Sequence, residues 1–322
     1  MLRILLTRRL FPESEALLRR SFRLTRVPRL AAGVVSQLTD VVDGAFMDRF
    51  PRLRVISQCA VGVDNIDLAA ARSRGIAIMN TPGVLTQATA DMTWALILAV
   101  ARRLPEADRV CRDGAFAGWD LEFMLGRDLA GGTLGIVGAG RIGAAVASRA
   151  AAFGMRVLIH TRGGPPAGPA WRGARPVSLA SLLSRSDVVS LHVPATPATH
   201  HLIGDRELGR MKRGAILINT SRGTIVDERA LVAALKKRRI WGAGLDVFAR
   251  EPRIPRALRA LDNVVLTPHI ASATRGTRGA MATLAAANLV EYFAGRPDAG
   301  RLIEPGVRNP GRRERRPAAG PA

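Results

Sequence analysis

The fold is decided by a short stretch near the middle of the chain, residues 133–143, which reads TLGIVGAGRIG. Its first five residues, Thr133–Val137, are mostly apolar and predict a β-strand, and the glycines that follow have the spacing G-x-G-x-x-G. The pattern then predicts a helix over Ala144–Phe153 and a second strand over Arg156–His160. This βαβ unit predicts a doubly wound parallel sheet.

Each glycine of the turn has a separate task. Gly138 permits the tight turn, Gly140 lets the backbone approach a pyrophosphate, and Gly143 lets the helix pack closely on the strand. Backbone N–H groups at the start of the helix then face the anion. An S-adenosylmethionine site and a purely structural turn share this glycine pattern, but the flanking strands favour a dinucleotide site.

The end of the second strand indicates which dinucleotide binds. NAD sites carry an Asp or Glu there, which accepts hydrogen bonds from the ribose 2′-hydroxyl. Here the strand ends in His160, Thr161 and Arg162, with no acidic side chain. A guanidinium binds a 2′-phosphate through paired, charge-assisted hydrogen bonds, so we expect NADPH, with NADH as the alternative. Alternatively, Arg162 is a solvent-exposed surface residue that does not bind the cofactor.

Further elements are predicted on both sides of this unit. Apolar runs predict strands before it and after it, at Arg3–Thr7, Phe22–Val27, Ala32–Gln37, Leu53–Ala60, Ile76–Asn80, Val188–His192, Ala215–Asn219, Gly242–Val247 and Val264–Thr267. Helical patterns occupy Ser178–Ser184, Asp205–Met211 and Asp227–Lys237. Thr86–Arg102, apolar almost all round, predicts a buried helix that joins two domains. Gly279–Ala294 predicts a last helix that returns to the first domain.

These elements predict an α/β protein of two doubly wound, Rossmann-like domains with a cleft between them. The cofactor domain is inserted in the substrate domain. We expect the substrate domain over residues 1–84 and 275–307, the dinucleotide-binding domain over 85–274, and a disordered basic tail over 308–322.

One connection in the first domain is unusually short. Only Pro28–Ala31 separates two predicted strands, whereas a parallel crossover usually takes a dozen or more residues. We therefore expect either a rearranged strand pair or a missing edge element.

The formal net charge of +22 raises the question of a nucleic-acid or membrane partner. Lysine accounts for only three of the 48 basic residues, and the arginines are spread along the whole chain, which argues against a selected patch. We expect no nucleic-acid and no membrane partner, although the basic tail leaves a weak anionic partner open. Cys59 and Cys111 suggest neither disulfides nor a zinc site, so we expect a cytoplasmic protein.

Three strand ends in the second half carry polar residues of different kinds: Arg222, Glu251 and His269. Ligands bind at the carboxyl ends of such strands. Reduction of a 2-keto acid needs a cation for the carboxylate, a proton donor for the developing alkoxide, and a group that orients the donor. Arginine, histidine and glutamate supply these three roles. Taken singly, each residue is equally well explained as a surface, loop or cap residue.

At these residues the chain resembles the D-isomer-specific 2-hydroxyacid dehydrogenases, most closely their glyoxylate/hydroxypyruvate reductase branch. The shared motifs run in family order along nearly the whole chain: residues 61–67 (VGVDNID), 80–84 (NTPGV), 138–143, 191–194 (LHVP), 219–223 (NTSRG), 245–248 (LDVF) and 268–270 (PHI). The resemblance implies the two-domain fold, a nicotinamide cofactor, a small 2-keto or 2-hydroxy acid substrate and a homodimer. The segment around Trp119 then reaches toward the neighbouring subunit.

The resemblance also implies a role for each site residue. His269 is the general acid in reduction and the base in oxidation, with Glu251 bonded to its ring, and the carboxylate stabilises the protonated imidazole. Arg222 holds the substrate carboxylate and polarises its carbonyl. The N–H groups of Val61 and Gly62 complete the carboxylate site, so that Val61, Gly62, Arg222 and His269 bind the substrate.

Cofactor contacts are implied for a larger set of residues. These are Gly138, Gly140, Arg141, Ile142, Gly143, Thr161, Arg162, Val193, Pro194, Thr220, Asp246, His269 and Ala271. Asp246 is expected near the nicotinamide amide. His192, His200 and His201 form no metal-ligand spacing with a cysteine or carboxylate pair, so we expect no metal.

The predicted activity is therefore the reduction of glyoxylate or hydroxypyruvate to the D-2-hydroxy acid by hydride transfer from NADPH. Other dehydrogenases of the family, such as phosphoglycerate, formate or phosphite dehydrogenases, are rivals. A corepressor-like protein that binds dinucleotide without turnover is the alternative from a different class.

Overall fold

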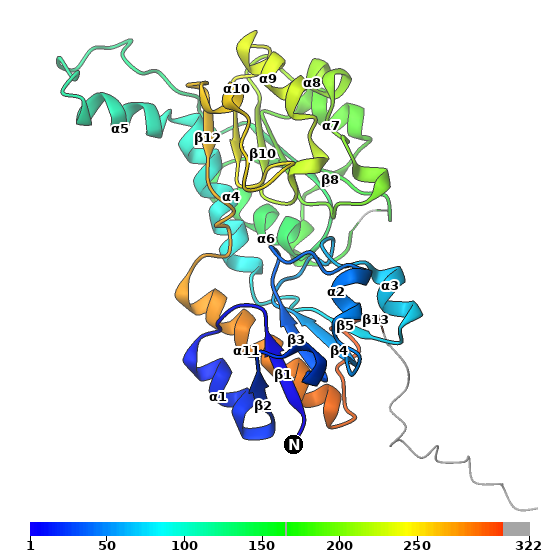
Figure 1. Cartoon of the computed structure of the whole chain (residues 1–322). Coiled ribbons are helices and arrows are strands. Elements are labelled where there is room, and N and C mark those ends of the chain that lie inside the picture. The colour runs from blue at the N-terminus through cyan, green and yellow to red at the C-terminus, as the bar shows by residue number, and fades with distance from the viewer. Residues whose placement is uncertain (165, 305–322) are drawn as a thin grey trace, which may run out of the picture. The chain divides into compact units, whose positions relative to one another are not determined.

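The structure, a computed structural model, describes residues 1–164 and 166–304. The chain divides into two compact units: Met1–Leu85 together with the chain from Thr274 onward (unit 1), and Thr86–Ala273 (unit 2). Each unit is built on one sheet of mostly parallel strands with helices on both faces (Figure 1). This confirms the predicted α/β class with two Rossmann-like domains. The predicted basic tail, 308–322, lies outside the described residues.

Unit 1 contains a sheet with the strand order β13-β5-β4-β3-β1-β2, parallel except that β13 runs antiparallel to β5. Its strands are β1 (Arg3–Leu6), β2 (Arg23–Thr25), β3 (Gly33–Ser36), β4 (Val55–Gln58), β5 (Ala77–Met79) and β13 (Leu302–Glu304). Its α-helices are α1 (Pro12–Ser21), α2 (Gly44–Asp48), α3 (Leu68–Ser73) and α11 (Arg275–Phe293).

Buried residues on both faces of this sheet explain why helices cover it twice. Val35 and Val55 pack with residues of α1 and α11 on one face, whereas Val34 and Ile56 pack with residues of α2 and α3 on the other. Side chains alternate between faces along a strand, so apolar runs of this kind predict a sheet buried on both sides. Helix α11 comes after unit 2 in sequence and packs against α1 and β4 of unit 1.

The short connection of the first domain corrects one prediction. Strands β2 and β3 are both present and both parallel to β1, on its opposite sides. The chain between them contains only a 3-10 turn, Pro28–Leu30. The expected rearranged pair or missing edge element was therefore wrong. Because the strands are only three or four residues long, an extended link of seven residues can return to the start of the sheet.

Unit 2 contains a fully parallel sheet with the order β12-β11-β10-β9-β6-β7-β8. Its strands are β6 (Thr133–Val137), β7 (Arg156–His160), β8 (Arg175–Pro176), β9 (Val188–Leu191), β10 (Ile216–Asn219), β11 (Gly242–Leu245) and β12 (Val264–Leu266). Its α-helices are α4 (Thr86–Ala101), α5 (Leu104–Arg112), α6 (Arg141–Ala150), α7 (Leu179–Arg185), α8 (Asp205–Arg210), α9 (Glu228–Lys236) and α10 (Arg256–Arg259). Its described residues also form 3-10 turns, at Ala151–Phe153, Pro169–Trp171, Pro197–Thr199 and Gly223–Ile225.

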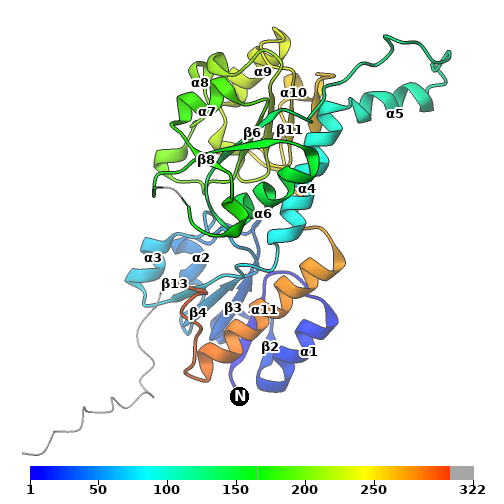
Figure 2. The same ribbon diagram turned by 180° about the vertical axis from the view of Figure 1, so that it is seen from behind.

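Two helix layers cover the sheet of unit 2, as Figure 2 shows from behind. Helices α4 and α6 pack on residues such as Ile136 and Ile218, whereas α7, α8 and α9 pack on residues such as Val189 and Leu217. Strand β6 lies between β7 and β9, so the chain leaves β6 in one direction and later continues in the other. This reversal of strand order marks the position where doubly wound folds bind their ligands.

The boundaries differ from the predictions at a few elements. Helix α6 begins at Arg141, three residues before the predicted start, because Gly140 caps it and Gly143 lies inside its first turn. Its predicted last turn, Ala151–Phe153, is a 3-10 turn that ends at Gly154. Strand β8 has only two residues, one of them Pro176, and such a strand has no periodic pattern by which it could be predicted.

Candidate active site

The glycine turn after β6 fits a pyrophosphate. Gly138 has a φ of +108°, and a Cβ added there would lie 2.4 Å from the carbonyl oxygen of His192. A Cβ on Gly143 would lie 2.3 Å from the carbonyl oxygen of Gly138. Gly140, by contrast, faces open space, and as N-cap of α6 it offers no side chain to the first N–H groups. The backbone donors of Arg141 and Ile142 at the start of this helix therefore suit an anion.

Two other cofactor candidates lie on either side of this turn. Thr161 and Arg162 directly follow β7, and Arg162 is exposed, with no hydrogen bond or ion pair to any other residue that the structure describes. Val193 and Pro194 lie in the loop after β9, one residue beyond its end, and Thr199 donates a hydrogen bond to the Pro194 carbonyl at 2.7 Å. Because β7 and β9 flank β6, all three segments leave the sheet at neighbouring carboxyl ends.

Arg222 lies in a tightly braced turn after β10. The Asn219 side chain donates to the Arg222 carbonyl at 2.8 Å and accepts from the backbone N–H and the hydroxyl of Ser221, each at 3.0 Å. Thr220 forms a buried hydroxyl pair with Thr93 of α4 at 2.9 Å. A Cβ on Gly223 would lie 1.9 Å from the Phe248 carbonyl carbon, so only glycine lets this turn touch the loop after β11.

The next two loops bring Glu251 and His269 together. His269 Nδ1 lies 2.8 Å from one Glu251 oxygen, and the other oxygen accepts from the Phe248 N–H at 3.0 Å. The ring nitrogen Nε2 of His269 has no partner among the described residues. Nδ1 is thus engaged by the carboxylate, and Nε2 is left as the nitrogen that can exchange a proton with a ligand.

Electrostatics keep Glu251 ionised. Partial desolvation of the side chain opposes its ionisation, but the hydrogen bonds from His269 and from the Phe248 N–H, with the charges of His269 and Arg222, outweigh it and lower the pKa of Glu251. Arg222 is therefore close enough for its charge to act on Glu251. The structure brings all three predicted catalytic residues into one group.

Asp246 holds the backbone of the histidine loop. Its carboxylate is fully buried and accepts hydrogen bonds from the Thr267 hydroxyl at 2.6 Å and from the N–H groups of Ile270 and Ala271, each at 2.8 Å. Its carbonyl accepts from the His269 N–H at 2.9 Å. His269 has a φ of 54°, a left-handed conformation that non-glycine residues adopt only where the surroundings enforce it. A contact of Asp246 or Ala271 with the cofactor stays a prediction.

The bracing by Asp246 leads to our first prediction. In the Asp246→Asn variant an amide N–H₂ replaces one acceptor, so a buried backbone N–H of the loop loses its partner, at a cost of about 1–3 kcal/mol. We expect the unfolding midpoint to fall by about 2–4 °C for each kcal/mol, and turnover to fall with it, because His269 is no longer held in place. Calorimetry and NADPH titration together check this. Weaker NADPH binding at an unchanged melting temperature would show that the carboxylate acts on the cofactor instead.

His192 is a neutral histidine beside the glycine turn. Burial lowers its pKa to about 4, and its Nε2 lies 2.8 Å from the Ser190 hydroxyl. The residue directly follows β9 and contributes its carbonyl to the packing of Gly138. The ring is therefore uncharged at neutral pH, and its bond to Ser190 holds it beside the turn. No group of three or more metal-binding side chains occurs among residues 1–164 and 166–304.

Val61 and Gly62 lie in unit 1, in the loop after β4. Asn80 donates to the Val61 carbonyl at 2.7 Å, and Gln58 donates to the Asn65 side chain at 2.7 Å and to the Gly62 carbonyl at 3.5 Å. Within the described part of the chain the N–H groups of Val61 and Gly62 have no acceptor. A loop with fixed carbonyls and two unpaired donors suits a carboxylate.

Several supporting residues were not predicted as functional. Asn219 braces the Arg222 turn, and Gln58 and Asn80 brace the Val61 loop. All three are amides at or next to strand ends, a position where Asn and Gln commonly bond neighbouring backbone.

In the described part of the chain, no helix combines the length and apolar character that a membrane span needs.

Comparisons with known proteins agree with this geometry. Residues 94–271 match the family model described as D-isomer specific 2-hydroxyacid dehydrogenase, NAD binding domain. A doubly wound sheet with a glycine turn at the start of a helix is the arrangement that binds dinucleotides, in agreement with that description. The chain belongs to the D-isomer-specific 2-hydroxyacid dehydrogenase family, and the protein is an NAD(P)-dependent oxidoreductase that acts on a small 2-keto or 2-hydroxy acid.

Individual relatives narrow the comparison. Over 313 residues the chain is 47% identical to the glyoxylate reductase of Aeropyrum pernix, covering 91% of this chain and 93% of that protein. The crystal structure of the TT0316 protein from Thermus thermophilus aligns with a TM-score of 0.87 at 47% identity, over 94% of this chain and 100% of that chain. The NADPH-dependent glyoxylate/hydroxypyruvate reductase of Sinorhizobium meliloti aligns with a TM-score of 0.82 at 34% identity, over 94% and 97%.

Proposed function

We propose that this protein reduces glyoxylate or hydroxypyruvate, with NADPH, to glycolate or D-glycerate. The observation that carries the proposal is the Glu251–His269 contact of 2.8 Å, with Nε2 of the ring unpartnered among the described residues and Arg222 beside it. The names of its relatives, a glyoxylate reductase and an NADPH-dependent glyoxylate/hydroxypyruvate reductase, support the choice of substrate.

Each residue then has a defined role in the reaction. His269 donates a proton from Nε2 to the oxygen on which negative charge develops, while ionised Glu251 holds Nδ1 and stabilises the charged ring. Arg222 binds the substrate carboxylate and polarises the keto group. The unpaired N–H groups of Val61 and Gly62 in unit 1 bind the same carboxylate. A bound nicotinamide supplies the hydride.

We also propose that unit 2 is the dinucleotide-binding domain and unit 1 the substrate domain. The pyrophosphate binds at the N-terminus of α6, at Gly138, Gly140, Arg141, Ile142 and Gly143. The nicotinamide end is contacted by Thr220, Asp246, His269 and Ala271. The part of the dinucleotide between the pyrophosphate and the nicotinamide is contacted by Val193 and Pro194. The free thiols Cys59 and Cys111 are consistent with a reducing compartment such as the cytoplasm.

NADPH is proposed because Arg162 offers a charged donor to a 2′-phosphate and no carboxylate follows β7. In the Thr161→Asp variant, the new carboxylate repels that phosphate and accepts from a ribose hydroxyl. We expect the ratio of kcat/KM for NADPH over NADH to fall by at least about 10-fold, or about 1.4 kcal/mol. Thr161→Asn, of the same size without charge, is the control. An unchanged ratio in the aspartate variant contradicts the assignment.

A homodimer is proposed from an exposed apolar segment of unit 2. Figures 1 and 2 show α5 and the chain after it extending away from the rest of this unit. Trp119 and Leu121 in this segment are 83% and 75% exposed. Apolar side chains gathered at such exposure normally mark an interface, so we expect a second copy to cover them. Light scattering that reports a monomer at micromolar concentration contradicts this.

Steady-state oxidation of NADPH and NADH tests the proposed activity. Glyoxylate, hydroxypyruvate, pyruvate and phosphohydroxypyruvate serve as competing acceptors, and we expect the first two to have the highest kcat/KM. A preference for phosphohydroxypyruvate would indicate a phosphoglycerate-type enzyme. Dinucleotide binding without measurable turnover of any acceptor would indicate the corepressor-like alternative.

A further inference from the structure

A large cavity of about 850 Å³ lies in unit 1, and nothing in the proposed reaction uses it. It is formed by the chain after β1, the chain after β2, and helices α1 and α2, and neither Val61 nor Gly62 lines it. Pro28, in the 3-10 turn that connects β2 to β3, forms part of its wall. A turn of three residues covers less of the sheet than a helix does, so the cavity remains open.

The position of the cavity in the sheet suits a ligand. Strand β1 lies between β2 and β3, so the chain leaves β1 on one side and continues from β3 on the other. Thr7, Arg8 and Arg9 directly follow β1, and Asp40 follows β3. The carboxyl ends of adjacent strands at such a reversal are the general place for ligands in open α/β sheets.

The cavity carries more positive charge than its own acids can balance. Five arginines line it, against Glu15 and Asp40. Glu15 is paired with Arg19 at 3.3 Å, and Asp40 accepts from the Thr7 hydroxyl at 2.5 Å and the Gln37 N–H at 2.7 Å. The other four arginines form no ion pair with a described residue. They are Arg8, Arg9, Arg26 and Arg49.

These four guanidinium groups are held to different degrees. Arg8 donates through Nε to the Thr39 hydroxyl at 3.1 Å, and the Arg49 guanidinium lies over the Phe46 ring at 4.8 Å from its centre. Arg9 and Arg26 make neither a hydrogen bond nor an ion pair with any residue that the structure describes. Two of the guanidinium groups thus contact neighbouring side chains, and two have no hydrogen bond or ion pair within the described residues. Four such groups around one cavity suit an anion with several oxygens.

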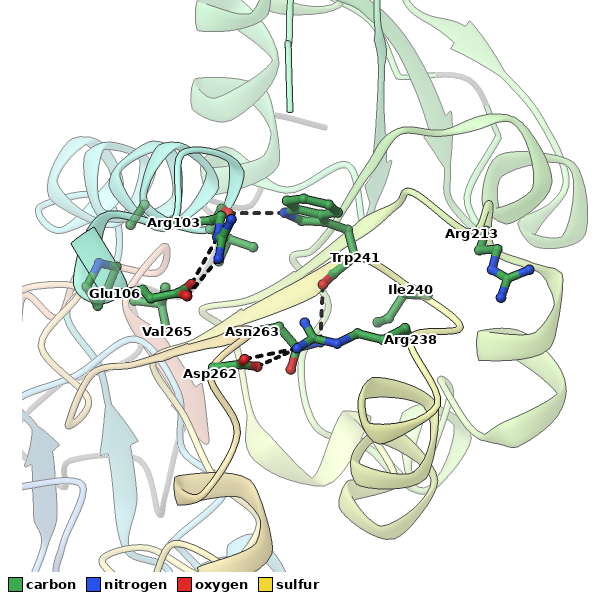
Figure 3. Close-up of a pocket in the computed structure, with 12 residues that line it drawn as sticks. Arg103, Glu106, Arg213, Arg238, Ile240, Trp241, Asp262, Asn263 and Val265 are labelled. Atoms are coloured by element: carbon green, nitrogen blue, oxygen red, sulfur yellow. Dashed lines mark hydrogen bonds and ion pairs between the residues drawn. The ribbon is translucent and has the colours of Figure 1, made fainter. Parts of the chain in front are cut away.

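A cavity of about 400 Å³ in unit 2 shows the contrast (Figure 3). There Arg103 is paired with Glu106 at 2.7 Å and Arg238 with Asp262 at 2.8 Å, while Trp241 donates to the Val100 carbonyl at 3.3 Å. Most of its polar groups already have partners within the protein. The cavity of unit 1 differs because four of its five arginines form no ion pair with a described residue.

We propose that the cavity of unit 1 binds a small organic phosphate as a second ligand, separate from the reacting substrate. The guanidinium groups take the phosphate oxygens through charge-assisted forks, and the apolar wall of Leu5, Leu24 and Phe46 takes the carbon skeleton. A phosphate is favoured over a single carboxylate because several guanidiniums surround one volume. The cavity lies in the range of sizes that hold a nucleotide-sized molecule.

The test is a titration of ADP and of inorganic pyrophosphate into the whole protein by calorimetry. The protein is first loaded with one equivalent of NADPH, so that the glycine turn of unit 2 is occupied. We expect one ADP to bind per chain, tighter than pyrophosphate because the wall contributes. The double variant Arg9→Ala/Arg26→Ala should weaken ADP binding at least about 10-fold.

A matched double variant separates this site from general positive charge. Arg20→Ala/Arg23→Ala removes the same charge from exposed positions on α1 and β2 that do not line the cavity. Its ADP affinity should stay within about two-fold. Bound ADP should also protect Arg9 and Arg26, and not Arg20 and Arg23, from modification by phenylglyoxal, read by mass spectrometry.

Three results overturn the proposal. They are the absence of ADP binding to the NADPH-loaded protein, an equal loss in the two double variants, and equal affinity for ADP and pyrophosphate. The last would show an anion site without a place for the carbon skeleton. None of these readouts depends on turnover, so they stand even where the proposed reduction fails.

Discussion

Replacing His269 with glutamine is expected to lower kcat with glyoxylate by about 10²- to 10⁴-fold, the range that a positioned general acid contributes. Glutamine retains a donor toward Glu251 and similar bulk, so the loop after β12 should keep its fold. The loss then reports the missing proton donor at Nε2 and no wider damage. Affinity for NADPH should stay within a few-fold of the wild type.

The comparison variant for His269→Gln changes its hydrogen-bonding partner, Glu251. Glu251→Gln keeps a hydrogen-bonding side chain but removes the negative charge that stabilises the protonated ring. We expect it to be impaired less than His269→Gln, because the proton donor itself remains. Single-turnover kinetics with unchanged melting temperatures check both. Wild-type turnover by His269→Gln would exclude His269 as the acid.

Much of unit 2 was predictable because its signals are local. The turn after β6 carries its glycines within six residues, and strand β6 was predicted with its observed bounds, Thr133–Val137. The grouping of Arg222 with His269 was also predictable, because both residues stand just past apolar strands. A residue just past a strand stays near that end of the sheet, because each residue advances the chain by only about 3.3 Å.

Other features depend on contacts between distant segments and were not predictable. The left-handed backbone of His269 is maintained by Asp246, 23 positions earlier in the sequence, and the place of Gly223 is fixed by its approach to Phe248. The sequence around β2 predicted a defect, yet the strand is present because pairing with β1 stabilises three residues that have little pattern of their own. Tertiary pairing decides such short strands.

Replacing Arg222 with glutamine is expected to raise the acceptor KM and to lower kcat/KM by about 10²- to 10³-fold, or about 3–4 kcal/mol. The effect is large because the guanidinium both binds the carboxylate and polarises the keto group, so it acts before and during the reaction. Unlike His269→Gln, this variant should lose part of its activity through KM. Its pattern across acceptors should therefore depend on their carboxylate.

The Arg222→Lys variant separates charge from geometry. Lysine keeps the positive charge but has no planar fork to hold a carboxylate in two places, so we expect an activity between those of the wild type and Arg222→Gln. The turn itself should survive either change, because it is braced by Asn219 through the backbone at 222 and by the close approach at Gly223. Unchanged KM values for glyoxylate and hydroxypyruvate in Arg222→Gln would place the carboxylate elsewhere. In that case the unpaired donors of Val61 and Gly62 would have to carry its binding alone.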